Sequence, residues 1–214
     1  MAKRFSKTKM IQKIKIKELI LKSLLYVMIS LLVLSQTAAA DNKSAAEVVL
    51  KSKLEAILAL LQQKELEQQA KTKEAVKIIE AMFDFPLMAR LTLKKYWAGL
   101  DQEKKERFIE LFKKNLKEFY LETLNLYTDE KIVYKAPVQG KKKRKVLIPT
   151  ELISKGERIS MDYKLYRSKN NWKIYDVEIK GTSIIRTYQS QFYHDMRSGT
   201  IDDLIQKLEN PQDK

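Results

Sequence analysis

The chain contains no cysteine, one histidine, five glycines and four prolines among its 214 residues. The absence of cysteine excludes disulfide bridges and any zinc or iron–sulfur site with cysteine ligands. No two glycines lie closer than 16 residues, which excludes the glycine-rich loops that bind dinucleotides or nucleoside triphosphates. With 44% hydrophobic residues, the chain is long enough and apolar enough for one globular domain with its own core.

Side chains suited to catalysis are also scarce. The single histidine, His194, makes a poor metal site and a poor catalytic triad. Ser183 and Asp84 stand where helices are expected to begin, so both are interpreted as helix caps. Asp176 and Glu178 share one face of a predicted strand; either they form a carboxylate pair in which one member has a raised pKa, or, as is commoner, they are exposed strand residues opposite lysines. We therefore predict no catalytic residue, no metal site and no cofactor other than a bound cargo.

The first forty residues have the pattern of an export signal. Residues 1–22 carry eight lysines and arginines and one acid, residues 24–34 are almost all apolar, and small residues follow up to Ala40. This order is typical of a secretory signal peptide. The apolar run is shorter than the ~20 residues that span a bilayer. We predict a signal peptide over 1–40, with cleavage after Ala40, and one domain over 41–214; the alternative is an uncleaved N-terminal anchor.

Positive charge dominates the chain, with a formal net charge of +15. Residues 1–40 hold eight basic residues and one acid, so residues 41–214 carry the remaining +8. The absence of cysteine is consistent with export to an oxidising compartment. Export also argues against nucleic acid as the natural partner. The densest basic run consists of five consecutive residues at a predicted hairpin tip: Lys141, Lys142, Lys143, Arg144 and Lys145. This run is either a solvated turn or a surface that meets acidic lipid headgroups or an acidic partner protein.

Hydrophobic periodicity changes along the chain from helical to strand-like and back. Helical spacing covers much of residues 48–124, and alternation with a period of two predicts four strands over 131–136, 144–153, 158–167 and 172–179. Helices are expected again after residues 181 and 200. The order predicts an α+β domain with N-terminal helices, a four-stranded antiparallel meander sheet and C-terminal helices that cover one face.

Aromatic residues are unevenly distributed. All 17 aromatic residues after residue 40 lie between Phe83 and Tyr193, so the middle helices, the sheet and the helix after residue 181 form an aromatic wall. Such side chains either fill a core or line an apolar cleft between the sheet and the helices. A cleft of that kind binds apolar ligands.

Two stretches of the chain resemble a known family. FDFPLMAR at 83–90, followed by YW at 96–97 and FIELF at 108–112, is similar to the toluene-tolerance (MlaC) family of periplasmic phospholipid-binding proteins. WKIYDVEI at 172–179, GTSII at 181–185 and YQSQF at 188–192 resemble the closing strand and helix of that family. The similarity runs from about Ser44 to Leu208. Lys94 and Gln189 depart from it, since the family often has Gly and Arg there.

The resemblance implies a function without catalysis. Members are auxiliary components of the Mla pathway: soluble periplasmic carriers that shuttle phospholipid between an outer-membrane lipoprotein–porin complex and an inner-membrane ABC transporter with an MCE-domain subunit. They thereby maintain the lipid asymmetry of the outer membrane. For this chain the resemblance implies a phospholipid cargo, and we expect the protein to be a monomer.

Fourteen residues are predicted to contact the lipid chains: Phe83, Met88, Leu91, Trp97, Phe108, Phe112, Leu116, Phe119, Met161, Tyr163, Leu165, Ile185, Tyr188 and Phe192. Two alternatives stay open. One is an isomerase- or hydratase-like enzyme with Asp176 or Asp84 as the base in an apolar pocket. The other is an interaction module that binds an acidic protein through the basic hairpin tip.

Overall fold

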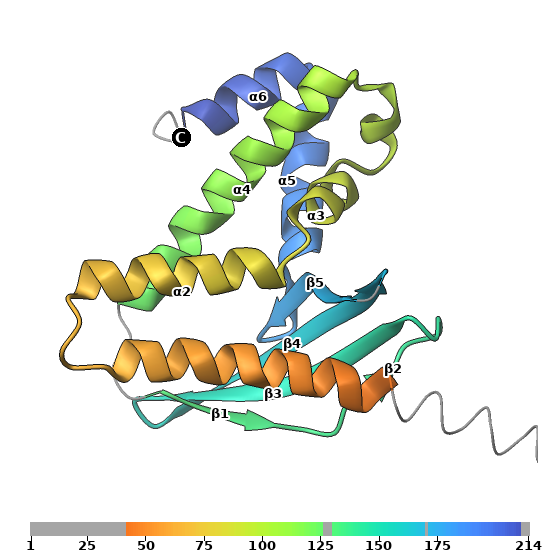
Figure 1. Cartoon of the computed structure of the whole chain (residues 1–214). Helices are drawn as coiled ribbons and strands as arrows, with labels where there is room; N and C mark the ends of the chain where they lie inside the picture. The colour runs from red at the N-terminus through yellow and green to blue at the C-terminus, as the bar shows by residue number, and fades with distance from the viewer. Residues whose placement is uncertain (1–41, 126–129, 170, 211–214) are drawn as a thin grey trace, which may run out of the picture. The chain divides into compact units, whose positions relative to one another are not determined.

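The structure, a computed structural model, describes residues 42–125, 130–169 and 171–210, and within these the side chains of all but 119, 120 and 122–125 (Figure 1). The predicted signal peptide lies outside the described residues. Among the described helices, none is both long enough and apolar enough to cross a membrane.

Helices occupy both ends of the described chain. They are a helix over residues 42–62, α2 (Gln68–Met82), α3 (Phe85–Leu93), the 3₁₀ helix η1 (Lys94–Gly99), α4 (Gln102–Asn125), α5 (Ile184–Ser198) and α6 (Ile201–Glu209). The predicted cap at Asp84 is confirmed, since its carboxylate accepts a hydrogen bond from the backbone N–H of Leu87 at 2.9 Å. Lys94 has a positive φ of 50°, and at this residue the α-helix gives way to the 3₁₀ helix.

The sheet contains the four predicted strands and two more. β1 (Lys131–Tyr134), β3 (Lys145–Ser154), β4 (Glu157–Ser168) and β5 (Asn171–Ile179) match the prediction closely, whereas β2 (Val138–Gln139) and β6 (Thr182–Ser183) were not predicted. All pairs are antiparallel, in the order β1-β3-β4-β5-β6 with β2 also on β3. The prediction of four strands was therefore wrong, because a two-residue strand is too short to show an alternating pattern.

The register of the sheet gathers its apolar side chains on one face. Val146 pairs with Leu165, and Ile148 pairs with Tyr163, which in turn pairs with Val177. This alternation continues past a bulge between Lys164 and Leu165.

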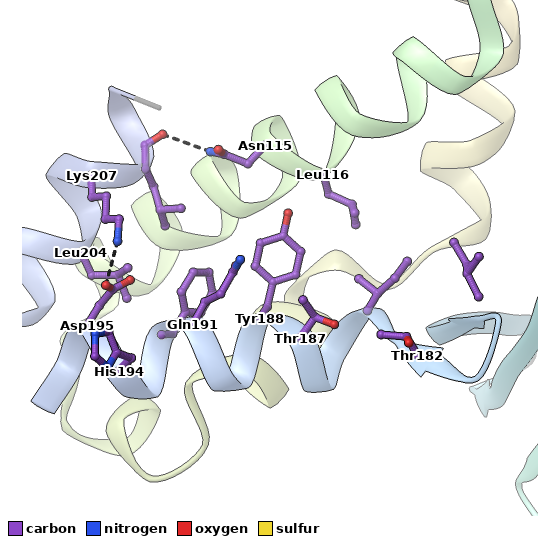
Figure 2. Close-up of a pocket in the computed structure, with 14 residues that line it drawn as sticks. Asn115, Leu116, Thr182, Thr187, Tyr188, Gln191, His194, Asp195, Leu204 and Lys207 are labelled. Carbon is purple, nitrogen blue, oxygen red and sulfur yellow. Dashed lines mark hydrogen bonds and ion pairs between the residues drawn. The ribbon is translucent and has the colours of Figure 1, made fainter. Parts of the chain in front are cut away.

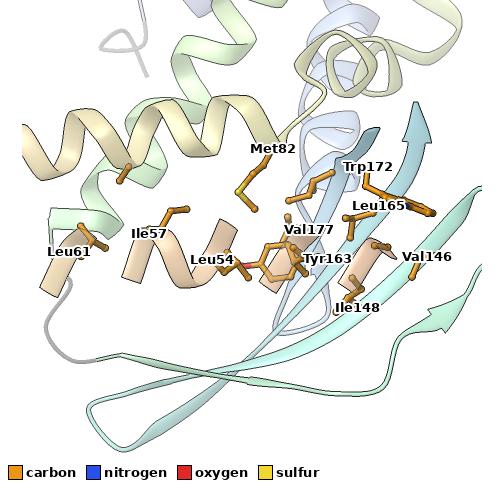
Figure 3. Close-up of a cluster of buried hydrophobic side chains, with 14 residues drawn as sticks. Leu54, Ile57, Leu61, Met82, Val146, Ile148, Tyr163, Leu165, Trp172 and Val177 are labelled. Atoms are coloured by element: carbon orange, nitrogen blue, oxygen red, sulfur yellow. The ribbon is translucent and has the colours of Figure 1, made fainter. Parts of the chain in front are cut away.

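The helix over residues 42–62 covers this face, together with α2 (Figures 1 and 3). We call the resulting core the sheet-side cluster. Its buried members are Ala46, Leu50, Leu54, Ile57, Leu61, Ala75, Met82, Val146, Ile148, Tyr163, Leu165, Trp172, Ile174 and Val177. The first helix contributes aliphatic side chains at spacings of three and four, so it lays one apolar stripe on the sheet.

The remaining helices form a second core, the helical cluster. Its buried members are Phe85, Met88, Ala89, Leu93, Leu100, Phe108, Leu111, Phe112, Leu116, Ile185, Phe192, Leu204 and Leu208. Phe83 and Ile184 pack against both clusters. The C-terminal helices were expected to cover the sheet, but they pack mainly with α3 and α4, and α5 meets the sheet at β5 and β6. The first helix already fills the apolar face that they were expected to cover.

Leu50 tests the packing of the first helix on the sheet. Because Leu50 is 1% exposed, Leu50→Ala is expected to lower the free energy of unfolding by about 2–5 kcal/mol, through lost burial and the cavity left behind. Val48 on the same helix is 63% exposed, and Val48→Ala is expected to change the free energy of unfolding by less than about 0.5 kcal/mol. Urea unfolding measures both, and equal effects would contradict this arrangement.

Candidate functional site

An apolar pocket lies among α4, α5 and α6, beside the end of β5 (Figure 2). Its volume is about 660 Å³, within the usual range of ligand pockets. The lining residues are Asn115, Leu116, Ile179, Thr182, Ile184, Thr187, Tyr188, Gln191, Phe192, His194, Asp195, Leu204, Lys207 and Leu208. This pocket lies among the helices, whereas the cleft predicted from the sequence lies between the sheet and its covering helices.

Helix α5 supplies half of this lining through one of its faces. Ile184, Tyr188, Gln191 and Asp195 follow one another at spacings of three and four, so they share a face. Ser183 starts the helix, because its hydroxyl accepts a hydrogen bond from the backbone N–H of Arg186 at 3.1 Å. This cap was predicted from the sequence and is confirmed.

The pocket has a polar end and an apolar end. Figure 2 shows Lys207, Asp195 and His194 together at one end and Leu116 farther along the pocket toward Thr182. Lys207 Nζ lies 2.7 Å from Asp195 Oδ1, and the lysine side chain is 47% exposed. Charge is therefore confined to the end formed by α6 and the last turns of α5.

Tyr188 stands in the middle of the pocket and is fixed by other rings. Its ring centroid lies 5.1 Å from that of Phe112 and 5.3 Å from that of Phe192. Burial raises the pKa of the Tyr188 hydroxyl, so this group stays protonated at neutral pH. Tyr188 and Phe192, two members of the predicted aromatic wall, thus line the pocket.

Helix α6 closes the pocket and is tied to its neighbours by polar contacts. Asn115 of α4 donates a hydrogen bond to the Leu208 carbonyl at 3.0 Å. Lys104 pairs with Asp202 at 2.8 Å, and Arg107 Nε donates to Glu209 at 2.8 Å. These contacts hold α6 along α4.

A buried carboxylate joins α5 to the sheet. Asp176 is 5% exposed and accepts hydrogen bonds from the Ser183 hydroxyl at 2.8 Å, from the Ile185 backbone N–H at 3.2 Å and from Lys164 Nζ at 2.9 Å. The helix N-terminus favours a negative charge at this position. Asp176 therefore fixes where α5 starts and hence where its pocket face lies.

Lys164 bridges Asp176 to a second acid, Glu178. Burial lowers the pKa of Lys164, but its hydrogen bonds to Glu178 and Asp176 outweigh that effect and raise the pKa overall. The hydrogen bond from Lys164, at 2.5 Å, is the main reason that the pKa of Glu178 is lowered, and Arg186 adds to it. Asp176 and Glu178 thus form an ion-pair network on the strand.

Asp84, the other acid considered as a base, has a comparable structural role. Besides capping α3, it accepts a hydrogen bond from the Tyr166 hydroxyl. Neither Asp84 nor Asp176 lines the pocket. In the part of the chain that the structure describes, no cluster of three or more His, Asp or Glu side chains is arranged to hold a metal ion.

The predicted lipid-contacting residues fall into separate groups. Leu116, Tyr188 and Phe192 line the pocket. Met88, Phe108, Phe112 and Ile185 are buried in the helical cluster, with Leu91 and Trp97 packed against it and Phe83 between the two clusters. Tyr163 and Leu165 are buried in the sheet-side cluster, with Met161 packed against it, and the Phe119 side chain lies outside the described residues.

Several lining residues were not predicted. Thr187, Gln191 and Asp195 did not meet the criterion of apolar character, whereas Ile184 is apolar and was still not among the predicted residues. Their helical spacing along α5 was the available signal.

Two other hollows have a larger share of charged side chains in their walls. One, of about 740 Å³, lies between α2 and α4 and has lysine, glutamate and glutamine on most of its wall. The other, of about 590 Å³, lies between α3, η1 and α5 and includes Lys94, Lys95 and Arg186. The pocket among α4, α5 and α6 is therefore the better candidate for an apolar ligand.

Comparison with known proteins now identifies the family. The model of the MlaC protein family matches residues 51–210, about three quarters of the chain. The chain belongs to the MlaC family. The resemblance predicted from the sequence motifs is thereby confirmed.

Among solved structures, this MlaC-family chain is similar to the phospholipid-binding protein from Ralstonia solanacearum, solved in complex with a phospholipid. The TM-score is 0.70 at 24% sequence identity, over 77% of this chain and 95% of that one. This likeness supports the α+β fold. A comparison with curated proteins finds no match.

Asp176 offers a test of the joint between α5 and the sheet. Asp176→Ala leaves the Ser183 hydroxyl and the Ile185 N–H without their buried acceptor, while Lys164 keeps Glu178, and the expected loss in the free energy of unfolding is about 2–4 kcal/mol. Asp202→Ala, which removes an exposed partner of Lys104, is the control and is expected to cost less than about 1 kcal/mol. Urea unfolding of the MlaC-family protein and both variants measures these values; a small effect at Asp176 would refute the anchoring role.

The lowered pKa of Glu178 predicts a pH dependence of stability. A carboxylate whose pKa is lowered by folding stabilises the fold above its ordinary pKa, and this contribution disappears as the pH falls through the lowered value. At neutral pH the unmodified chain is therefore expected to have a larger free energy of unfolding than the Glu178→Gln variant. This difference is expected to shrink toward zero in acid. Thermal unfolding across that range measures it, and a difference that grows in acid would contradict the ion pair.

Proposed function

We propose that this protein carries a phospholipid whose acyl chains occupy the pocket among α4, α5 and α6. The observation that carries the proposal is an apolar pocket of about 660 Å³ within an MlaC-family fold. The phospholipid held by the similar Ralstonia solanacearum protein gives the ligand class.

The energetics of lipid transfer explain why a carrier is needed. Two acyl chains expose ~30 methylene groups, and at about 0.8 kcal/mol each their exposure to water costs roughly 24 kcal/mol. A pocket lined by Leu116, Ile179 and Ile184 removes part of this cost by replacing water with apolar side chains. Transfer between membrane and carrier needs little net free energy once the pocket encloses both chains.

The pocket volume sets how much lipid it holds in this conformation. If a methylene group occupies about 30 Å³, similar to a water molecule, then 660 Å³ corresponds to ~20 methylene groups. That is more than one acyl chain and less than two. Binding both chains therefore requires the walls to move apart, and α6 is the wall whose ion pairs with α4 are exposed.

The two ends of the pocket suggest an orientation for the lipid. The chains lie toward Leu116 and Ile179, and the headgroup lies at the end with His194, Asp195 and Lys207. This end is open to water, since Lys207 is half-exposed. Chain length and number therefore determine binding more than headgroup identity does.

The physiological role proposed here is transport between membranes without catalysis. The exported protein, cleaved after Ala40, acts as a monomer in the periplasm and exchanges lipid with an outer-membrane lipoprotein–porin complex and with the MCE-domain subunit of an inner-membrane ABC transporter. Maintenance of outer-membrane lipid asymmetry follows from this exchange. The direction is set by the partner that hydrolyses ATP.

Lipid extraction followed by mass spectrometry tests the binding function. Protein purified from the cell envelope is expected to contain phospholipid, and the lipid-free protein is expected to take up phospholipid from vesicles. Protein that lacks lipid and takes up none would refute the carrier proposal.

Leu116 provides the corresponding mutational test. Leu116→Asp places a charge in the apolar part of the pocket and is expected to lower lipid occupancy at least several-fold, because an unpaired charge is unfavourable beside acyl chains. Native mass spectrometry of the purified protein measures the lipid-bound fraction. Val48→Asp, at an exposed apolar residue outside the pocket, is the matched control and is expected to leave occupancy unchanged.

A second variant guards against loss of folding. Thr187 is exposed and lines the pocket, so Thr187→Phe reduces the pocket volume without adding a buried charge. This variant is expected to stay folded and to lose lipid. Full occupancy in a folded Thr187→Phe protein would exclude this pocket as the lipid site.

A further inference from the structure

One end of the sheet carries basic residues without acidic ones. Residues 131–150 and 163–175 contain no aspartate or glutamate. The first stretch includes the turn between β2 and β3, and the second includes the turn between β4 and β5. These turns lie side by side, since the backbone N–H of Arg167 donates a hydrogen bond to the Arg144 carbonyl at 2.9 Å.

Six exposed basic residues project from these two turns. They are Lys141, Lys142, Lys143, Arg144, Lys145 and Lys169, which we call the basic end. Among the described residues, Lys141, Lys142, Lys143 and Arg144 form no ion pair with an acid. Their charges are therefore available to an outside partner.

The backbone of the β2–β3 turn is held in a defined conformation. The side-chain amide of Gln139 donates hydrogen bonds to the carbonyls of Lys143 at 3.2 Å and Lys145 at 2.6 Å. Gly140 also closes the turn, because its N–H donates to the Lys145 carbonyl at 2.8 Å, and a side chain there would come within 3.0 Å of Lys145. The basic side chains are thus presented together on an ordered turn.

The composition of this surface favours a lipid bilayer over a protein. Protein interfaces are depleted in lysine and are centred on buried aromatic anchors. The basic end consists mostly of lysine, and its nearby aromatic ring, Tyr175, lies beneath Lys145, whose Nζ is 4.4 Å from the ring centroid. Val138, 52% exposed next to the turn, adds a small apolar contact.

We propose that the basic end docks this protein on the surface of a bilayer that contains anionic phospholipids, with the lysine ammonium groups on the lipid phosphates. Each basic residue near such a surface strengthens binding roughly fivefold, and the attraction weakens with salt. The proposal does not depend on lipid occupying the pocket.

Docking in this way leaves the lipid pocket accessible. Figure 1 shows α6 and the adjoining end of α5 well away from β2 and the neighbouring hairpin tips. The polar end of the pocket, at Asp195 and Lys207, belongs to that distant region. The protein can thus be held at a membrane while the pocket meets a second partner.

Vesicle co-sedimentation of the full chain tests the proposal. The probes are vesicles of phosphatidylcholine alone and of phosphatidylcholine mixed with phosphatidylglycerol. The variant Lys141→Gln, Lys142→Gln, Lys143→Gln, Arg144→Gln removes four charges from the basic end. The matched control, Lys53→Gln, Lys64→Gln, Lys73→Gln, Lys114→Gln, removes four exposed charges elsewhere, so both variants have the same net charge and the same residues 1–41.

The unmodified chain is expected to bind the phosphatidylglycerol vesicles more tightly than phosphatidylcholine alone, and increasing salt is expected to weaken that binding. The partition coefficient of the basic-end variant onto the phosphatidylglycerol vesicles is expected to be at least about tenfold lower than that of the unmodified chain, and that of the control variant is expected to fall much less. Equal losses in the two variants, or unchanged binding in the basic-end variant, would overturn the proposal. Lipid content in the pocket, measured on the same samples, is expected to be unaffected, which separates this test from that of the carrier function.

Discussion

The hydrogen bonds that Asp176 makes with the start of α5 determine how the helical half of the molecule is attached to the sheet. The carboxylate accepts hydrogen bonds from the Ser183 hydroxyl and from the Ile185 backbone N–H. Lys164, on the neighbouring strand β4, pairs with the negative charge of Asp176. A second joint lies two residues earlier on β5, where the backbone N–H of Asp84 donates a hydrogen bond to the Ile174 carbonyl at 2.9 Å. Both joints act on β5, so α3 and α5 are positioned by the same strand.

This attachment separates the sheet-side cluster from the helical cluster, beside which the pocket lies. The sheet-side cluster is covered by a helix without aromatic residues, whose leucines interdigitate with the alternating strand residues. In the helical cluster, Phe108, Phe112 and Phe192 pack at one level, while the neighbouring face of α5 presents Thr187 and Gln191. Small and polar side chains do not fill the distance between α4 and α6, and the pocket results.

Local chemistry made much of the fold predictable. The caps at Asp84 and Ser183 and the four longer strands depend on neighbouring residues, and the sequence contains those neighbours. The placement of the pocket depends on which apolar stripe meets which partner. Periodicity shows that Tyr163 and Leu116 both belong to apolar faces, yet one contacts the first helix and the other the pocket. Long-range packing determines which of these two environments each side chain occupies, and a local sequence pattern contains no information about such packing.

The walls of the pocket differ in how strongly they are held, which bears on how a two-chain lipid enters. Helix α5 is fixed by a buried carboxylate, whose loss leaves buried hydrogen-bond donors without an acceptor. Helix α6 has nine residues, with Leu204 and Leu208 buried and its ion pairs to Lys104 and Arg107 exposed to water. Exposed pairs contribute about 0–1 kcal/mol each, so displacing α6 costs less than displacing α5. Enlargement of the pocket is therefore easiest on the α6 side, where the headgroup is proposed to lie.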